Sequence, residues 1–164
     1  RQLARQTLAL VRPLVRREAP IEFAVAEDGG DARAPVDAGP MQHVFTNVLV
    51  NAIQAMPRGG TIRIGARAER ARPPDPPGAP EAEHVVVTIE DEGPGIAPEH
   101  LDRIFEPFFT TKDVGQGTGL GLSVSHGIAR EHGGWIAAAS RPGAGSRFSI
   151  YVPKEGSGGC RAGS

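Results

Sequence analysis

The glycine-dense segment at residues 115–122 has the composition needed to hold a polyphosphate. It alternates glycine with Gln116, Thr118 and Leu120, and it opens directly into an expected helix. Alternating glycines let the backbone approach a ligand closely, and the unpaired N–H groups of a first helical turn attract anions. A flexible hinge is the alternative interpretation of the glycines alone. The segment matches neither a Walker loop nor the dinucleotide fingerprint, and the signatures of Ser, Thr and Tyr kinases are absent.

A second candidate is the segment Asp-Glu-Gly-Pro-Gly-Ile at residues 91–96, which follows an apolar strand. A carboxylate there can accept a hydrogen bond from an exocyclic amine, and the two glycines leave room for a flat ring against the backbone. We interpret Asp91 as a residue that binds adenine. A simple Asp-Gly turn at the end of a strand is the alternative.

A third candidate is the pair Asn47 and Asn51, which are four residues apart and therefore lie on the same face of a helix. Two amide oxygens on the polar side of an otherwise apolar helix can face Mg²⁺ and its waters. The alternative is a solvated helix face.

The elements that position these residues follow from hydrophobic periodicity and from turn residues. Helices are expected near residues 1–18, 41–56, 98–104 and 120–132, and strands near 21–25, 61–66, 85–90, 135–139 and 146–152. Residues 67–84, which are rich in proline, predict a hairpin loop. The fold class that results is α+β, a two-layer sandwich in which about three helices cover one face of a mixed sheet.

Composition limits the possible partners. The 164 residues carry a formal net charge of -1 and no long run of one charge, which argues against nucleic acid or a membrane surface as a partner. The longest apolar stretch, at residues 85–89, is far too short to cross a bilayer. Cys160 is the single cysteine and cannot form an internal disulfide, which is compatible with a reducing cytoplasm. A start at arginine rather than methionine suggests a fragment.

Four ordered motifs together resemble the catalytic and ATP-binding domain of sensor histidine kinases, in the superfamily with gyrase B and MutL-type ATPases. Residues 47–56 match the N box, 91–96 the first glycine box, 105–112 the F box and 117–122 the second glycine box. The resemblance implies a Bergerat-type ATP-binding fold over residues 1–153, with nucleotide loops and a lid at 91–118 and a flexible tail at 154–164.

The resemblance also implies a role for each matching residue. Asp91 would bind the adenine amine, in a base pocket formed with Ala55, Gly93, Gly95, Ile96 and Ser146. Asn51 would hold Mg²⁺ with Asn47 beside it, and backbone N–H groups of Gly117, Thr118, Gly119, Leu120 and Gly121 would hold the phosphates. Lys112 is expected near the γ-phosphate, although an exposed loop lysine is the alternative. Phe105, Phe108 and Phe109 are expected to anchor their loop, unless one of them faces a partner domain.

The implied function is to bind Mg-ATP and to donate its γ-phosphoryl group. The acceptor would be a histidine on a separate dimerisation and phosphoacceptor domain, which in turn serves the receiver domain of a response regulator. None of the five histidines lies in such an acceptor motif, although His43, one turn before Asn47, could face the phosphates. We expect the fragment to be monomeric and cytoplasmic, even if the full protein has a membrane anchor elsewhere.

Three other functions stay open at this point. A serine kinase of the anti-sigma type shares the fold but is disfavoured by the F box. A conformational ATPase like gyrase would need an acidic base near Asn47, where an amide is a poor base. A nucleotide-binding module without catalysis is disfavoured because all four motifs are intact.

Overall fold

The computed structural model describes residues 6, 9, 20–25, 33–111 and 117–155. Apart from Gln6 and Ala9, which are helical, the helix expected at residues 1–18 lies outside the described residues. Lys112 and most of the expected tail also lie outside them. Lys154 and Glu155 are held on the domain, because their N–H groups donate to the carbonyls of Glu83 and Arg33, each at 3.0 Å. The first two residues of the expected tail thus contact the domain, and residues 156–164 lie outside the described residues.

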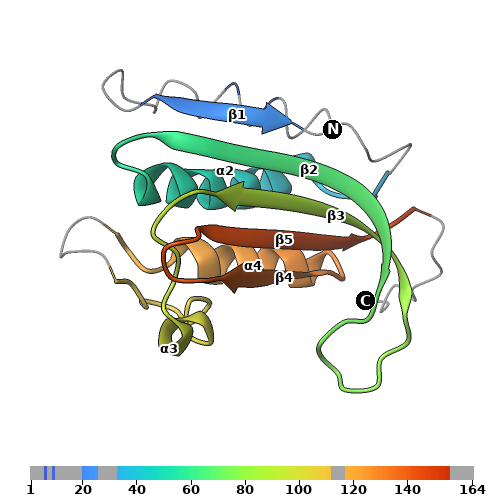
Figure 1. The fold of residues 1–164 in the computed structure, drawn as a ribbon. Helices are drawn as coiled ribbons and strands as arrows, with labels where there is room; N and C mark the ends of the chain where they lie inside the picture. The colour runs from blue at the N-terminus through green and yellow to red at the C-terminus, as the bar shows by residue number, and fades with distance from the viewer. Residues whose placement is uncertain (1–5, 7–8, 10–19, 26–32, 112–116, 156–164) are drawn as a thin grey trace.

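The sheet is mixed and has five strands in the described part of the chain (Figure 1). Its spatial order is β1-β2-β3-β5-β4. The edge strand β1 runs parallel to β2, and the other neighbours are antiparallel. The strand bounds are β1 Ile21–Val25, β2 Gly60–Ala71, β3 Ala82–Asp91, β4 Trp135–Ser140 and β5 Ser146–Pro153.

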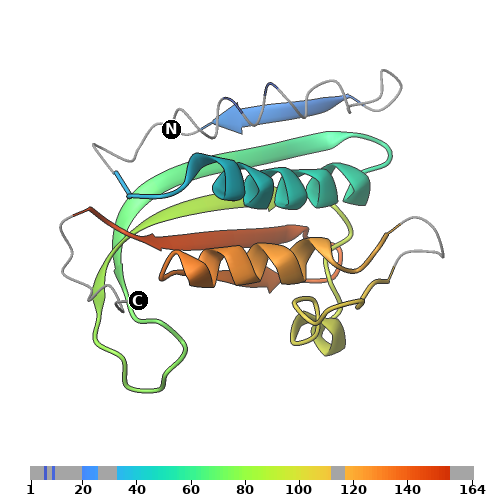
Figure 2. The ribbon, with the colours of Figure 1, turned by 180° about the vertical axis from the view of Figure 1, so that it is seen from behind.

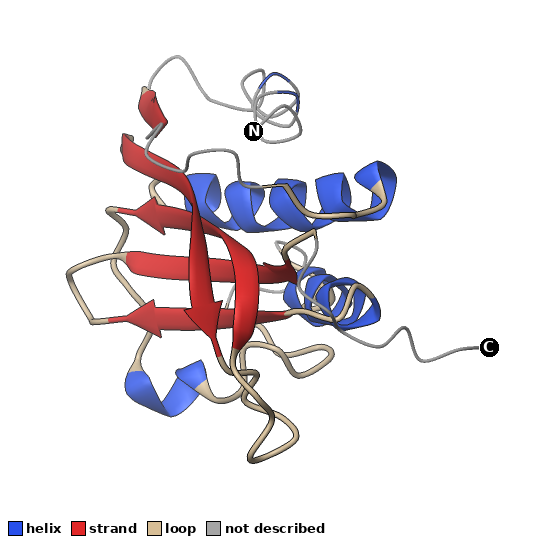
Figure 3. Cartoon of the chain, turned by 90° about the vertical axis from the view of Figure 1, so that its right-hand side faces the viewer, coloured by secondary structure: helices blue, strands red, loops and turns tan. Residues whose placement is uncertain are grey.

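Two helices, α2 (Ala38–Ala55) and α4 (Gly121–Glu131), cover one face of this sheet (Figures 2 and 3). A third, short helix, α3 (Pro98–Leu101), lies beside the edge strand β4, near the start of α4 (Figure 1). The two-layer α+β sandwich is thereby confirmed. None of the described helices is long and apolar enough to cross a membrane.

The core lies between the helices and the sheet. Apolar side chains recur along α2 at the helical period and are almost fully buried against alternate residues of the central strands. The fully buried members from α2 and the sheet include Val44, Val48, Leu49, Ile62, Ile89 and Ile150. Because one face of α2 is fixed by this core, the rotation of the helix is fixed, and so is the direction of its polar residues.

Two boundaries differ from the expectation. The helix expected from residue 41 begins at Ala38, because Pro40 falls in the first turn, where its missing N–H has no partner to lose. The hairpin loop expected at 67–84 is shorter, since β2 and β3 stay paired out to Ala71 and Ala82. Pairing between the two strands extends both of them, and only the proline-rich residues 72–81 form the loop.

Candidate functional site

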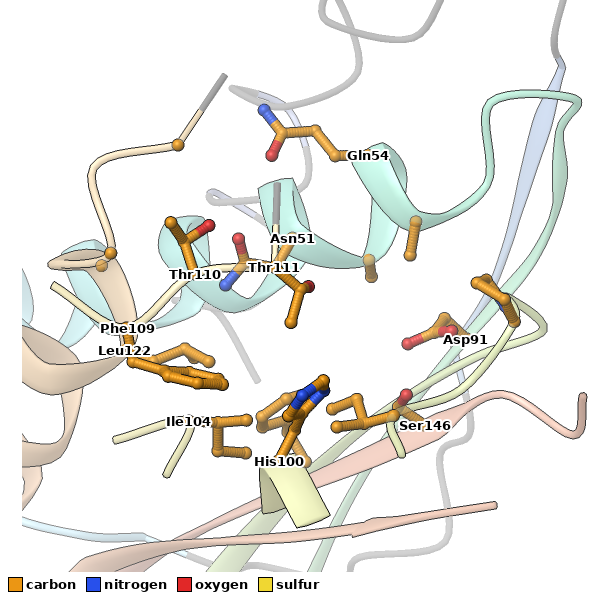
Figure 4. Close-up of a pocket in the computed structure, with 18 of the residues that line it drawn as sticks. Asn51, Gln54, Asp91, His100, Ile104, Phe109, Thr110, Thr111, Leu122 and Ser146 are labelled. Atoms are coloured by element: carbon orange, nitrogen blue, oxygen red, sulfur yellow. The ribbon is translucent and has the colours of Figure 1, made fainter. Parts of the chain in front are cut away.

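A cavity of about 670 Å³ opens at the end of the helical layer where α2, α3 and the start of α4 converge (Figure 4). Its walls come from segments far apart in the sequence: the second half of α2, the loop after β3, the chain around α3 and the glycine segment before α4. The lining includes ten of the residues expected to bind the nucleotide, namely Asn51, Ala55, Asp91, Gly95, Ile96, Gly117, Thr118, Gly119, Gly121 and Ser146.

One end of the cavity is built around Asp91, the last residue of β3. Asp91 is 7% exposed, and its Oδ1 accepts a hydrogen bond from the N–H of Gly93 at 2.8 Å. Burial raises the pKa of the Asp91 carboxyl, while hydrogen bonds from the backbone of Gly93 and Ser146 lower it; the raising effect prevails. The charged carboxylate at this end is therefore unfavourable in free energy because it is buried, and a hydrogen-bond donor on a ligand would stabilise it.

The chain around Asp91 is fixed by the hydroxyl of Ser140, at the end of β4. Ser140 Oγ accepts from the N–H of Ile96 at 2.7 Å, donates to the carbonyl of Gly145 at 2.8 Å and lies 3.1 Å from Ser146 Oγ. Gly95 has a φ of +76°, and a Cβ there would lie 2.2 Å from the carbonyl oxygen of Arg141. Only glycine therefore fits this loop against the β4–β5 turn.

The other end of the cavity is made by the glycine segment that leads into α4. Gly119 has a φ of +66°, and its carbonyl accepts from the N–H of Phe108 at 2.9 Å. The N–H of Leu120 donates to Thr118 Oγ1 at 3.3 Å, so this N–H is hydrogen-bonded within the glycine segment. Gly121 is the first residue of α4, and the N-terminal end of a helix favours an anion.

Helix α2 holds this glycine segment through Asn47. The side-chain amide Nδ2 of Asn47 donates to the carbonyl of Gly121 at 3.1 Å and to Ser125 Oγ at 3.0 Å. Ser125 is fully buried and its hydroxyl also donates to Gly121 O, at 2.8 Å. Asn47 is not among the residues that line the cavity, whereas Asn51, one turn later, is. The two asparagines therefore have different positions: Asn47 connects α2 to α4 by hydrogen bonds, and Asn51 lines the cavity.

Four expected residues are not part of the described cavity lining. Asn47 and Leu120 take the positions just given, Gly93 packs behind Asp91 against Ala55, and Lys112 lies outside the described residues. A Cβ on Gly93 would lie 2.8 Å from Asp91 Oδ1, so the absence of a side chain at Gly93 leaves space for the Asp91 carboxylate. His43 is exposed on α2 and does not line the cavity.

Sequence reasoning missed several lining residues, most notably His100, Thr110, Thr111 and Leu122. Thr110 and Thr111 lie within the F box and Leu122 within the second glycine box, whereas His100 lies between two motifs. No spacing rule separates these four from ordinary loop and helix residues. The three phenylalanines of the F box also divide: Phe105 and Phe109 pack on the core, whereas Phe108 is 75% exposed at a φ of 66°. Phe108 therefore does not anchor the loop by burial, which leaves the stated alternative, a ring that faces a partner domain, as a prediction for this residue.

Comparison with known proteins gives a match to one family over most of the chain. The model of the histidine kinase-, DNA gyrase B-, and HSP90-like ATPase family matches residues 36–156. Among curated proteins, the sensor kinase CckA of Brucella abortus (strain 2308) is 43% identical over 152 residues, which are 90% of this chain and 16% of that protein. The chain therefore spans about a sixth of the length of this relative.

Solved structures agree with this match in three dimensions. The catalytic domain of histidine kinase ThkA, in a nucleotide-free form, has a TM-score of 0.74 and 33% identity, covering 93% of this chain and 91% of that one. Full-length ShkA in complex with AMPPNP has a TM-score of 0.71 and 25% identity, covering 93% of this chain and 29% of that one.

Proposed function

Because this chain belongs to the histidine kinase-, DNA gyrase B-, and HSP90-like ATPase family and is homologous to catalytic domains of sensor histidine kinases, we propose that its cavity binds Mg-ATP for phosphoryl transfer to a histidine. The observation that carries the proposal is the polarity of the cavity: a buried carboxylate lies at one end and a glycine-rich helix start at the other. The two ends of ATP match these two ends of the cavity: adenine has an amine that can donate to a carboxylate, and the triphosphate carries negative charge that a helix start attracts.

At the base end, Asp91 accepts the adenine amine, with Ala55, Gly95, Ile96 and Ser146 around the ring. The raised pKa of Asp91 supports this role, because a buried carboxylate without a cation gains from a ligand donor. AMPPNP bound to the relative ShkA supports a nucleotide in this fold.

At the phosphate end, backbone N–H groups of residues 117–121 hold the phosphates, and Lys112 neutralises the γ-phosphate. Among the described residues no group of three His, Cys, Asp or Glu could hold a metal by itself. The protein ligands present would suit Mg²⁺ only together with phosphate oxygens. Asn51 would supply one amide oxygen, and waters would complete the coordination shell. When bound, Mg²⁺ would neutralise charge between the phosphates.

The phosphoryl acceptor is a histidine on a dimerisation and phosphoacceptor domain outside this chain, and a response regulator receives the phosphate from it. We propose that the catalytic unit spans residues 1–153 and works in the cytoplasm. Asp91 is the sole carboxylate in the described cavity lining, and it lies at the end opposite the phosphates. No carboxylate in that lining is placed to activate water at the phosphates, so we expect hydrolysis without an acceptor to be slow.

Calorimetric titration of the purified chain with Mg-ATP tests the binding step, and Asp91→Ala is expected to weaken affinity at least about tenfold by removing a charged acceptor. Adding a phosphoacceptor domain in trans with labelled ATP tests the transfer. An acid-labile, alkali-stable product supports phosphohistidine, whereas an acid-stable product would indicate a serine kinase. Undiminished affinity in the mutant, or rapid ATP turnover without acceptor, would contradict the proposal.

A further inference from the structure

His100 is a cavity residue to which the site described so far gives no role. It belongs to α3, and its ring points into the cavity from the wall opposite Asn51 (Figure 4). In this view it lies between Asp91 and Ser146 on one side and Phe109 and Leu122 on the other. Its position is therefore intermediate between the end that would hold the base and the end that would hold the phosphates.

The ring of His100 contacts the ring of Phe109, which in turn carries a cation–π contact. Its centroid lies 5.5 Å from that of Phe109 at an interplanar angle of 58°. The guanidinium of Arg103 lies over the same Phe109 ring, 4.6 Å from its centroid, and Arg103 Nε is 3.1 Å from Glu106 Oε2. This stack of aromatic and ionic contacts limits how the imidazole can rotate before a ligand arrives.

The nitrogens of the His100 ring have no hydrogen-bond partner within the described part of the chain. A half-buried imidazole carries one donor and one acceptor when neutral, and such groups are normally satisfied by protein, water or ligand. Among the labelled lining residues on one side of it, Ile104, Phe109 and Leu122 are apolar (Figure 4). A polar group of the ligand is the partner that this environment lacks.

On the proposed function, which this inference depends on, adenine lies at Asp91 and the triphosphate at residues 117–121. The part of ATP that joins them is the ribose, whose two hydroxyl groups can each donate and accept a hydrogen bond. We propose that His100 binds a ribose hydroxyl of the nucleotide and so makes the site selective for ribonucleotides over deoxyribonucleotides.

The test compares nucleotides that differ only in the sugar. Calorimetric titrations of the 164-residue chain with Mg-ATP, Mg-2′-deoxy-ATP and Mg-3′-deoxy-ATP are expected to show about 3- to 10-fold weaker binding of at least one deoxynucleotide. His100→Phe keeps a ring against Phe109 without ring nitrogens. It should weaken Mg-ATP by the same factor and bind all three nucleotides equally.

His43→Phe is the matched control, because His43 is exposed on α2 and lines no part of the cavity; it should keep the parent's preference. If His100→Phe does not fold, as judged by circular dichroism, His100→Gln provides a second variant with a donor and an acceptor, expected to keep part of the preference. Equal binding of all three nucleotides by the parent, or an unchanged preference in His100→Phe, overturns the inference while leaving ATP binding intact. A parent that binds no Mg-ATP overturns the proposed function as well.

Discussion

The two ends of the cavity are built in different ways. Around Asp91, tertiary contacts determine the backbone: Ser140 ties three segments together, and Gly95 packs on the carbonyl of Arg141 with no room for a side chain. The glycine segment is closely packed at Gly119, where a Cβ would lie 2.5 Å from the carbonyl carbon of Phe108. Its other positions are less constrained: the hydroxyl of Thr118 contacts only the nearby N–H of Leu120. A Cβ on Gly121 would find its nearest atom 3.8 Å away. The base end is thus preformed and leaves no room for substitution, whereas the phosphate end accepts change at Thr118 and Gly121 but not at Gly119.

This difference fits the demands of the proposed ligand. A flat base is recognised through the precise position of one acceptor and of the surfaces beside it, so preorganisation at that end improves affinity. Phosphates are held through several backbone N–H groups and the field of a helix end, which tolerate small shifts. The predictions below test whether mutations at the two ends differ in the same way.

The largest effect is expected from Gly95→Ala. The new Cβ would lie 2.2 Å from Arg141 O at a φ of +76°, so the loop must move. We expect the free energy of unfolding to fall by about 3 kcal/mol or more and Mg-ATP binding to be lost. Denaturant unfolding and calorimetry provide the measurements.

Gly127→Ala on α4 is the matched control for this substitution, because a Cβ there has no atom within 4 Å. Inside a helix, alanine is favoured over glycine, so we expect a gain of about 0.5–1 kcal/mol. Similar losses in both variants would show that the base end is no more tightly determined than an exposed helix surface.

An intermediate effect is expected from the ionisation of Asp91. Burial raises its pKa in the folded state, so the native protein binds this proton more tightly than the unfolded chain does. The contribution of Asp91 to stability is therefore full below its unfolded pKa and is lost as pH rises through the folded pKa. Mg-ATP affinity should run in the opposite direction, falling on acidification at a higher pH than an exposed aspartate would give.

Asp91→Asn separates the two effects, because the amide keeps an oxygen for the N–H of Gly93 but does not titrate. We expect it to be at least as stable as the parent at neutral pH, to bind Mg-ATP about tenfold more weakly, and to lose the acid-dependent decline. The measurements are thermal unfolding and calorimetry across pH. An identical pH profile in both proteins would exclude Asp91 as its source.

The smallest effects come from removing one hydroxyl at each end. Ser140→Ala leaves the N–H of Ile96 without its partner in a half-buried setting, and we expect unfolding to become easier by about 1–3 kcal/mol. Thr118→Ala removes the acceptor for the N–H of Leu120 at an exposed site, where water can replace it, so the loss should stay under about 1 kcal/mol. Chemical denaturation measures both, and equal losses would remove the distinction between the ends.

How much of this was readable from the sequence differs between helix and loop. Periodicity placed α2 and α4 to within three residues, because an amphipathic pattern is a local property of the chain. It failed at the ends of β2 and β3, where pairing continues through residues that have little strand character alone. Pairing between strands is a tertiary property, so composition underestimated their length.

By itself, the sequence determined the order of motifs and the fold class, since these depend on local residue types and their spacing. Through the family resemblance of those motifs, it also indicated ten of the residues that line the cavity. Only the tertiary structure decided that Asn47 joins α2 to α4 while Asn51 faces the cavity, that Ser140 organises the base end, and that His100 points inward. The physical reason is that a side chain's role depends on the distance and direction to atoms far away in sequence. Those distances are set when the helices and the sheet pack around one core.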